Sequence, residues 1–141
     1  MKDEEYLQLA YQEALKAAEI KETPVGCVIV YNDKIIGISH NTTQQETNPL
    51  LHAEILALEQ AFKNLKSKNL KGAKIYISLE PCLMCLGAII NAHISEIYFS
   101  ALDKKKGAFS FYNVSMQQLN VHYIESKKAG ELLTSFFASL R

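Results

Sequence analysis

Two short motifs carry the clearest chemistry in this chain, H-A-E at positions 52–54 and P-C-L-M-C at positions 81–85. Together they offer one imidazole and two thiolates, which are ligands that zinc favours, and one carboxylate. A structural zinc site is closed by four ligands, whereas a catalytic site keeps three and leaves a position for water. His52, Cys82 and Cys85 therefore predict a catalytic zinc site.

Both motifs are expected to open a helix. Pro49 shortly precedes the first motif and Pro81 directly precedes the first cysteine, and proline favours the first turn of a helix. Residues two apart on a helix point roughly 200° apart, so His52 and Glu54 can share a target only beyond the N-terminus of their helix. The two cysteines are three apart and lie on one face of their own first turn. Two helix N-termini are thus expected to face one point.

The charge of such a site favours catalysis. Two thiolates and a neutral imidazole bring divalent zinc to formal neutrality, so that a water there can lose a proton near neutral pH. Glu54 would accept that proton and pass it to the substrate, while water attacks an amidine-like ring carbon and ammonia leaves. We therefore expect Glu54 to be the catalytic residue beside the zinc ligands.

Two other kinds of site remain open on these residues. A thioredoxin-like redox pair would use the two cysteines but would leave His52 and Glu54 without a role. In a structural zinc site a fourth ligand is needed, and the candidates are Cys27, His40, His93 and His122. Cys27 lies in an apolar run that is typical of a core. His40 is expected in a solvated loop, and His93 and His122 are expected on the surface.

The hydropathy pattern predicts a single domain over residues 1–141. An N-D turn at 32–33 joins two strands in a hairpin. Helices and strands alternate in the middle of the chain, so we expect a three-layer α/β/α fold with helices on both faces of a mixed sheet of about five strands. The expected helices are 3–20, 51–65, 82–92 and 128–140, and the expected strands are 26–31, 34–39, 74–79, 96–100 and 121–125.

Composition argues against a disulfide-stabilised protein, a membrane protein and a protein that binds polyanions through its overall charge. At 141 residues with 48% hydrophobic content, the chain can bury a core. Its formal net charge of zero means that a polyanionic partner must be held by a local basic patch. Three cysteines, two of them in C-x-x-C, favour metal binding in a reducing compartment over a disulfide framework. An acidic N-terminus and the lack of an apolar run near the roughly 20 residues of a membrane helix predict a cytoplasmic protein without membrane contact.

The motifs resemble the cytidine deaminase superfamily, and within it the bacterial tRNA-specific adenosine deaminases. H-x-E followed by P-C-x-x-C is the signature of zinc-dependent nucleobase deaminases. The resemblance runs from 24 to 103 and resumes at 136–137. Cytidine deaminases of free nucleosides usually carry P-C-G-x-C, which is absent here. The most specific segments are P-V-G at 24–26, H-N at 40–41, N-P-L-L-H-A-E-I-L-A-L at 48–58 and S-L-E-P-C-L-M-C-L-G-A-I at 78–89.

The resemblance also implies substrate contacts and a homodimer. In the family, an asparagine hydrogen-bonds the target base and the alanine of H-A-E supplies a backbone contact to it. An aspartate and a lysine line the groove for the anticodon stem-loop, and phenylalanines of the last helix help to close that groove. Carried over to this chain, these positions are Asn41, Ala53, Asp103, Lys105, Phe136 and Phe137. Family members are homodimers, so a homodimer is implied here.

Two segments depart from the family's pattern. After the K-K-K-G run at 104–107, the family shows small residues ending in G-S-L, whereas this chain has A-F-S-F at 108–111 and is one residue shorter. The segment 124–132 before the last helix is shorter too. Both lie where RNA is expected, so they bear on the substrate and not on the zinc chemistry. The lysine triplet provides a basic loop of the kind that a phosphate backbone needs.

The expected reaction is therefore conversion of adenosine to inosine at the wobble position of a tRNA anticodon, where the base is cheaply flipped out. One alternative is a deaminase of a free base such as guanine or cytosine, because the guanine deaminases of the family share much of the second motif. Another is a non-catalytic zinc-binding module, although a scaffold has no use for Glu54. An open groove beside the site would favour RNA, and a deep closed pocket would favour a free base.

Overall fold

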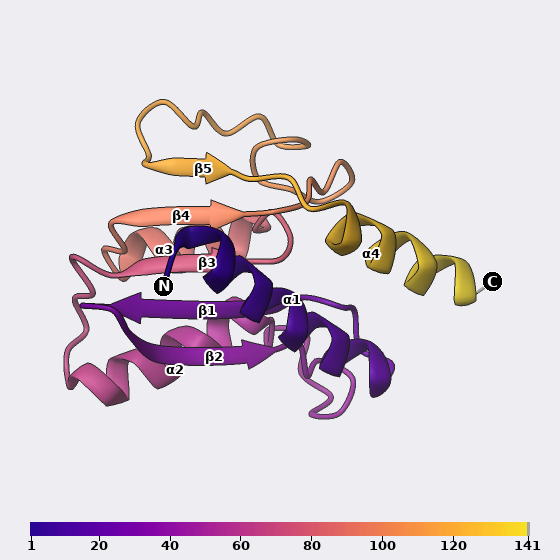
Figure 1. Ribbon diagram of the computed structural model, residues 1–141, viewed down its shortest axis with the longest axis horizontal. Coiled ribbons are helices and arrows are strands. Elements are labelled where there is room, and N and C mark those ends of the chain that lie inside the picture. Colours follow the sequence, from indigo (N-terminus) through magenta and orange to yellow (C-terminus); the bar gives the residue numbers. More distant parts are fainter. Residues whose placement is uncertain (141) are drawn as a thin grey trace.

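Residues 1–140 are described by the computed structural model of the chain, and they form alternating helices and strands (Figure 1). The helices are α1 (Asp3–Glu19), α2 (Ala53–Leu65), α3 (Leu83–Asn91) and α4 (Lys127–Ser139). The strands are β1 (Gly26–Tyr31), β2 (Lys34–His40), β3 (Lys74–Ile77), β4 (Glu96–Phe99) and β5 (Val121–Tyr123). Every expected element is present, with its ends shifted by two residues at most.

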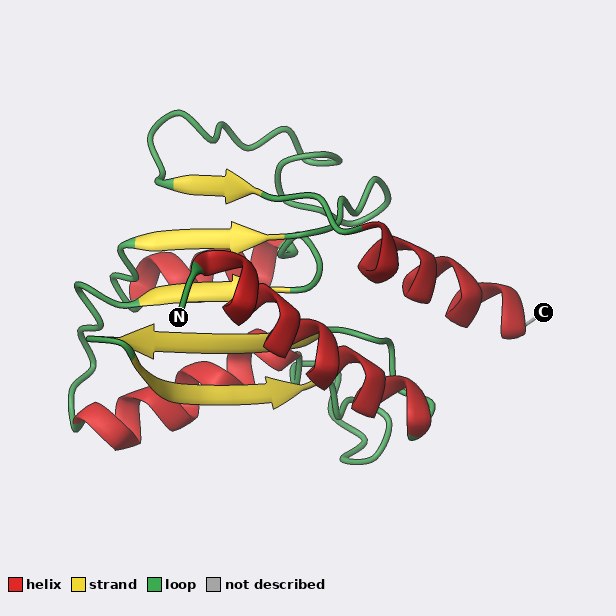
Figure 2. Ribbon diagram, in the orientation of Figure 1, coloured by secondary structure: helices red, strands yellow, loops and turns green. Residues whose placement is uncertain are grey.

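The five strands form one mixed sheet in the order β2-β1-β3-β4-β5 (Figure 2). Strand β1 runs antiparallel to β2 and β3, whereas β3, β4 and β5 are parallel to one another. The expected hairpin turn is confirmed, because Asn32 and Asp33 have φ values of 48° and 62°. In this topology β1 begins where β2 and β3 end. The loops that lead into α2 and α3 therefore start from the same edge of the sheet.

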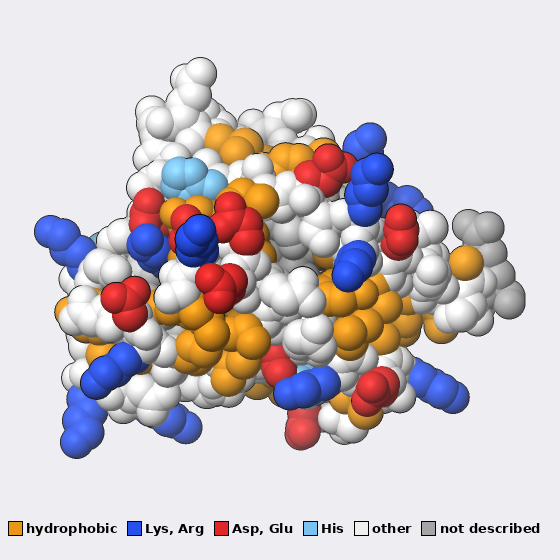
Figure 3. Space-filling view, viewed as in Figure 1, with side chains coloured by type: hydrophobic (Ala, Val, Ile, Leu, Met, Phe, Trp, Pro, Cys, Tyr) orange, Lys and Arg blue, Asp and Glu red, His pale blue; other side chains and the backbone are white. Residues whose placement is uncertain are grey.

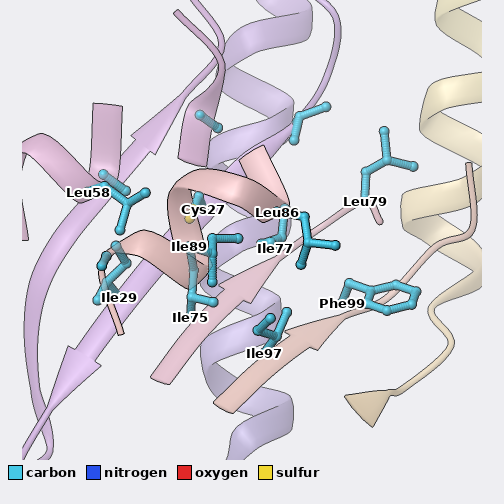
Figure 4. Packing of buried hydrophobic residues seen from close by; sticks show 14 of the residues in the cluster. Cys27, Ile29, Leu58, Ile75, Ile77, Leu79, Leu86, Ile89, Ile97 and Phe99 are labelled. Carbon is cyan, nitrogen blue, oxygen red and sulfur yellow. The ribbon is translucent and has the colours of Figure 1, made fainter. Parts of the chain in front are cut away.

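Helices cover both faces of the sheet, which confirms the three-layer prediction. Helix α1 packs on one face, and α2 and α3 pack on the other (Figure 1). Side chains alternate along the central strands, so that Val28, Val30, Tyr76 and Tyr98 join the cluster under α1. The residues between them belong to the larger cluster on the α2 and α3 side, where Figure 4 shows Cys27, Ile29, Ile75, Ile77, Ile97 and Phe99 packed with Leu58, Leu86 and Ile89.

Helix α4 differs from the other three because it extends beyond the end of the sheet (Figure 1). Its contact with another helix is made to α1, and within the helix Ala129 alone is buried. Among the described residues, no helix is both long enough and apolar enough to cross a bilayer. The lysine-rich stretch 63–74 contributes to the core, because Leu70 and Ala73 are fully buried.

Candidate metal centre and active site

His52, Cys82 and Cys85 meet at the edge of the sheet from which α2 and α3 begin. His52 is the N-cap of α2 and Cys82 is the N-cap of α3, both with extended backbone. The Sγ atoms of Cys82 and Cys85 lie 3.7 Å and 3.5 Å from Nδ1 of His52. Helix α2 begins at Ala53 rather than at the expected residue 51, which leaves His52 at its N-terminus. Two helix N-termini thus face one point, as the spacing predicts.

The donor set fits a zinc ion. A nitrogen and a sulfur bound to one tetrahedral zinc are about 3.6 Å apart, given the usual bond lengths to zinc. The distances from His52 to the two cysteines match this value, and all three donor atoms lie within 4.8 Å of one another. Within residues 1–140 no fourth donor joins this cluster. Three ligands with an open position are typical of a catalytic site rather than a structural one.

The pKa values of the two cysteines are shifted in opposite directions. Hydrogen bonding from Cys85, helped by His52, lowers the pKa of Cys82 to about 4. The same hydrogen bond, together with burial, raises the pKa of Cys85 well above its ordinary value. A bound divalent cation would favour the thiolate form of both cysteines. Because His52 contacts both sulfur atoms, it has a role that a simple redox pair would not give it.

Glu54 lies beside this cluster but is not one of its donors. Its side chain is 3% exposed and lines the same cavity as His52 and Cys82. Burial raises the pKa of Glu54 to about 7, although a cation nearby would lower it again. A carboxyl group with a pKa in this range can both accept and release a proton near neutral pH. That is the behaviour expected of an acid–base catalyst.

A cavity of about 760 Å³ joins this cluster to the last helix. Of the residues expected to contact the substrate, it brings together Asn41, Asp103, Lys105 and Phe137. Lys105 is exposed and Phe137 is 50% exposed, so the cavity opens to solvent at this rim. Phe136 does not line the cavity. It is half-buried, and its ring packs edge-on against that of Phe137 at 5.5 Å.

Asn41 and Ala53 are bonded to each other. The backbone N–H of Ala53 donates to Oδ1 of Asn41 over 2.8 Å, and both residues are buried. The amide nitrogen of Asn41 therefore remains as the group that can face a ligand in the cavity. The backbone N–H of Ala53 is used in this hydrogen bond, and the expected backbone contact from Ala53 to the base stays a prediction.

Two buried carboxylates that sequence reasoning missed shape the walls of the cavity. Glu22 is fully buried and accepts hydrogen bonds from the Thr43 hydroxyl and from the backbone of Gln44 and Gln45. Glu80 is 2% exposed and accepts hydrogen bonds from the loop that follows β4. The apolar neighbours of Glu80 in I-S-L-E-P-C were a signal of burial, but the polar surroundings of Glu22 gave none.

The remaining candidate ligands lie elsewhere. Cys27 is fully buried in the core, as expected. His40 is not in a solvated loop, since it ends β2 and its Nδ1 lies 3.1 Å from Oε1 of Glu13. His122 lies at the surface, as expected, with its side chain 41% exposed, and its ring stacks on that of Tyr98 with centroids 4.5 Å apart.

Comparisons with known proteins agree with this geometry. Residues 1–141 match the family model described as MafB19-like deaminase. The chain is 40% identical to the tRNA-specific adenosine deaminase of Aquifex aeolicus (strain VF5), over 100% of this chain and 97% of that protein. A solved structure from a study of A-to-I editing by tRNA:A34 deaminases at the wobble position of transfer RNA gives a TM-score of 0.81 at 32% identity, covering 92% of this chain and 99% of that one.

A guanine deaminase from Bacillus subtilis is also similar, with a TM-score of 0.73 and 27% identity over 99% of this chain and 94% of that chain. The matched proteins are deaminases of two substrate classes, and each match spans nearly the whole of both chains. The chain therefore belongs to the MafB19-like deaminase family, in the group that contains the tRNA-specific adenosine deaminases.

Proposed function

We propose that this protein is a zinc-dependent hydrolase that converts adenosine to inosine at the wobble position of a tRNA anticodon. The single observation that carries the proposal is the position of Glu54, buried beside three converging zinc-type donors in a cavity that opens at a basic rim. Similarity to tRNA-specific adenosine deaminases over the full chain supports the same substrate.

We assign one zinc ion per chain to Nδ1 of His52 and the Sγ atoms of Cys82 and Cys85. When bound, zinc supplies Lewis-acid activation of water at this point. Glu54 accepts a proton from the attacking water and delivers it to N1 of the adenine ring. It then takes the remaining proton from the hydroxyl group on C6 and delivers it to the amino group, so that the C6–N bond breaks, C6 becomes a carbonyl and ammonia leaves. The Asn41 amide holds the base so that its C6 atom faces the carboxylate.

The rim of the cavity favours an RNA substrate over a free base. Lys105 and Lys106 line it and carry exposed ammonium groups, for which a free purine offers no anionic partner. Phe137 presents a half-exposed ring on which an unpaired base can stack. A tRNA anticodon loop supplies both phosphates and unstacked bases to such a surface.

The test is to incubate zinc-loaded protein with an arginine tRNA whose anticodon begins with adenosine and to analyse its nucleosides for inosine. We expect inosine with the wild type and none with Glu54→Gln, which keeps the ligands and loses the proton carrier. If wild-type protein holding stoichiometric zinc leaves this tRNA free of inosine, the proposed substrate is wrong.

Deamination of free guanine is the second candidate, favoured by the similarity to the Bacillus subtilis guanine deaminase. The same zinc donors and the same carboxylate would serve that reaction. Ammonia release from guanine with none from tRNA would select it. Our proposal predicts the opposite pattern, because the lysines at the rim find their partners in RNA alone.

We further propose that the protein is a homodimer. Leu83 and Ile90 on α3 are 44% and 47% exposed, and the exposed Gly87 lies between them. The spacing places the three residues on one side of the helix, which is an apolar stripe facing solvent. A second copy would cover it. We expect a dimer in sedimentation and a monomer for Ile90→Glu; a wild-type monomer would contradict the assignment.

We also place the protein in the cytoplasm. Cys27, Cys82 and Cys85 are all free thiols, as a reducing compartment would keep them. The two cysteines of the metal cluster need this condition, because a disulfide between them would remove both sulfur donors.

A further inference from the structure

We infer that Glu80 is a positioning residue for RNA binding: its buried carboxylate fixes the loop 103–110 and so holds Lys105 and Lys106 at the rim of the cavity. The inference rests on the proposed function, because it supposes that the substrate carries phosphates. It assigns Glu80 no part in the chemical step, which is the task of Glu54.

The loop is folded around the Glu80 carboxylate. Oε1 accepts hydrogen bonds from the backbone N–H of Asp103 at 3.0 Å and from the Ser110 hydroxyl at 2.5 Å. Oε2 accepts from the backbone N–H groups of Phe109 and Ser110, at 2.9 Å and 2.8 Å. Four donors from both ends of one loop therefore converge on one side chain that is 2% exposed.

These contacts exclude Glu80 as a second acid–base group. An ionised carboxylate offers about four lone-pair positions, and four donors already occupy those of Glu80. A proton on either oxygen would displace one of these hydrogen bonds. Although Glu80 lines the cavity, its carboxylate is thus committed to the loop.

The middle of the loop is equally constrained. Gly107 pairs with Cys82 in an isolated bridge, and a side chain at Gly107 would collide with the Glu80 carboxylate and with the Asp103 carbonyl. Oδ1 of Asp103 accepts from the backbone of Lys105 at 3.1 Å and of Lys106 at 3.0 Å. The middle of the loop is therefore tied to a proposed zinc ligand, and the turn carrying the lysines is tied to Glu80 through Asp103.

The lysines on this turn are available to an anion. Lys104, Lys105 and Lys106 are exposed, and no ion pair found within residues 1–140 involves any of them. Because the backbone of the loop is already fixed, the loop loses less conformational entropy when these lysines bind phosphate. Without the carboxylate, the loop would have to be ordered by the RNA itself, at a cost in affinity.

The experiment uses full-length, zinc-loaded protein and an anticodon stem-loop substrate. Glu80→Gln replaces an acceptor oxygen by an N–H₂ group that faces backbone donors. We expect KM to rise by about tenfold or more, since a buried hydrogen bond to a charged group is lost, while kcat stays within about threefold. Because each phosphate contact to a single strand contributes about 0.7 to the salt slope, the slope of log(kcat/KM) against log salt should become shallower by about 0.7 to 1.4.

A milder pair of variants covers the case in which Glu80→Gln fails to fold. Ser110→Ala deletes one donor to Glu80 at an exposed position outside the cavity, and Ser110→Thr keeps the hydroxyl. We expect Ser110→Ala to raise KM several-fold with a shallower salt slope, and Ser110→Thr to restore both. Metal analysis of each variant should give the zinc content of the wild type.

An unchanged KM and salt slope in Glu80→Gln and Ser110→Ala would overturn the inference. A loss of kcat and zinc at constant KM would do so too, because it would mean that the carboxylate only supports the fold around Cys82. If the wild type itself makes no inosine in the stem-loop, the proposed function fails, and this result differs from either of the other two.

Discussion

Glu54 and His52 are two residues apart, and this separation gives them different tasks. His52 caps α2 and directs its Nδ1 toward Cys82 and Cys85. Glu54 lies within the first turn, buried among neighbours that raise the pKa of its carboxyl group to about 7. Under the proposed function, the same short motif thus supplies a metal ligand and a proton carrier that does not compete for the metal.

The first prediction separates those two tasks. Glu54→Gln should lower kcat by about a hundredfold or more, the usual contribution of a positioned acid–base group, with zinc content unchanged. Metal analysis and turnover of the same preparation check it. A variant that loses zinc as well would show that Glu54 supports the metal directly.

The second prediction compares cysteines. Cys85→Ser should lose bound zinc, because Cys85 is a member of the three-donor cluster. The matched control is Cys27→Ser, which alters a buried cysteine of the core and should lower stability while zinc content is kept. Equal zinc loss in both variants would argue against the assigned ligands.

Single residues were predictable from the sequence when their chemistry required a fixed type at a short spacing. That holds for His52, Cys82 and Cys85, which the structure brings together. Glu22 and Glu80 were missed because their partners lie 21 to 30 residues away along the chain. Nothing local distinguishes Glu22 from an ordinary surface glutamate, and the apolar neighbours of Glu80 indicate its burial but not its partners.

Among the elements, α1 and β1 are packed tightly at Gly26. A side chain at Gly26, the first residue of β1, would collide with the Ala10 carbonyl and with Cβ of Glu13 in α1. The hydropathy pattern predicted both elements but not this packing, because the pattern of an element does not report its distance from its neighbour. The topology of the sheet, with β1 antiparallel to β3, was likewise outside what the pattern could give.

The third prediction follows from that approach. Gly26→Ala should lower the free energy of unfolding by about 1–3 kcal/mol, because α1 has to move away from the sheet. Gly130→Ala in α4 is the control, since an added Cβ there meets nothing within 4 Å. It should raise stability by up to about 1 kcal/mol through helix propensity. Urea unfolding measures both, and equal effects of the two changes would be inconsistent with tight α1–β1 packing.

The fourth prediction concerns the contact between Glu13 in α1 and His40 at the end of β2. Burial tends to raise the pKa of Glu13, but hydrogen bonds with Lys16 and His40 outweigh it and lower the pKa below its ordinary value of 4.5. A lowered pKa in the folded state stabilises the fold above the unfolded pKa, and this stability is lost as pH falls through the folded pKa.

The stability difference between wild type and Glu13→Gln should therefore be largest near neutral pH and should shrink below about pH 4.5. Urea unfolding of both proteins at a series of pH values measures it. A difference that is constant or grows in acid would mean that the Glu13 contacts do not lower its pKa. Loss of metal in acid affects both proteins alike and cancels in the comparison.

The whole molecule carries no net charge, and its charges are interspersed on the face seen in Figure 3. Attraction for RNA therefore has to be local, which makes the fixed loop with Lys105 and Lys106 the feature that distinguishes a nucleic acid substrate from a free base. The motifs predicted the reaction, but the cavity that joins Glu54 to this loop and to Phe137 depends on contacts across the whole chain.

The most direct test of this account is reverse-transcription sequencing of an arginine tRNA after incubation with protein that holds one zinc per chain. Inosine is read as guanosine, so we predict an A-to-G change at the first anticodon position and at no other adenosine, and no change with Glu54→Gln. An unaltered anticodon after incubation with zinc-loaded wild type would contradict the central claim.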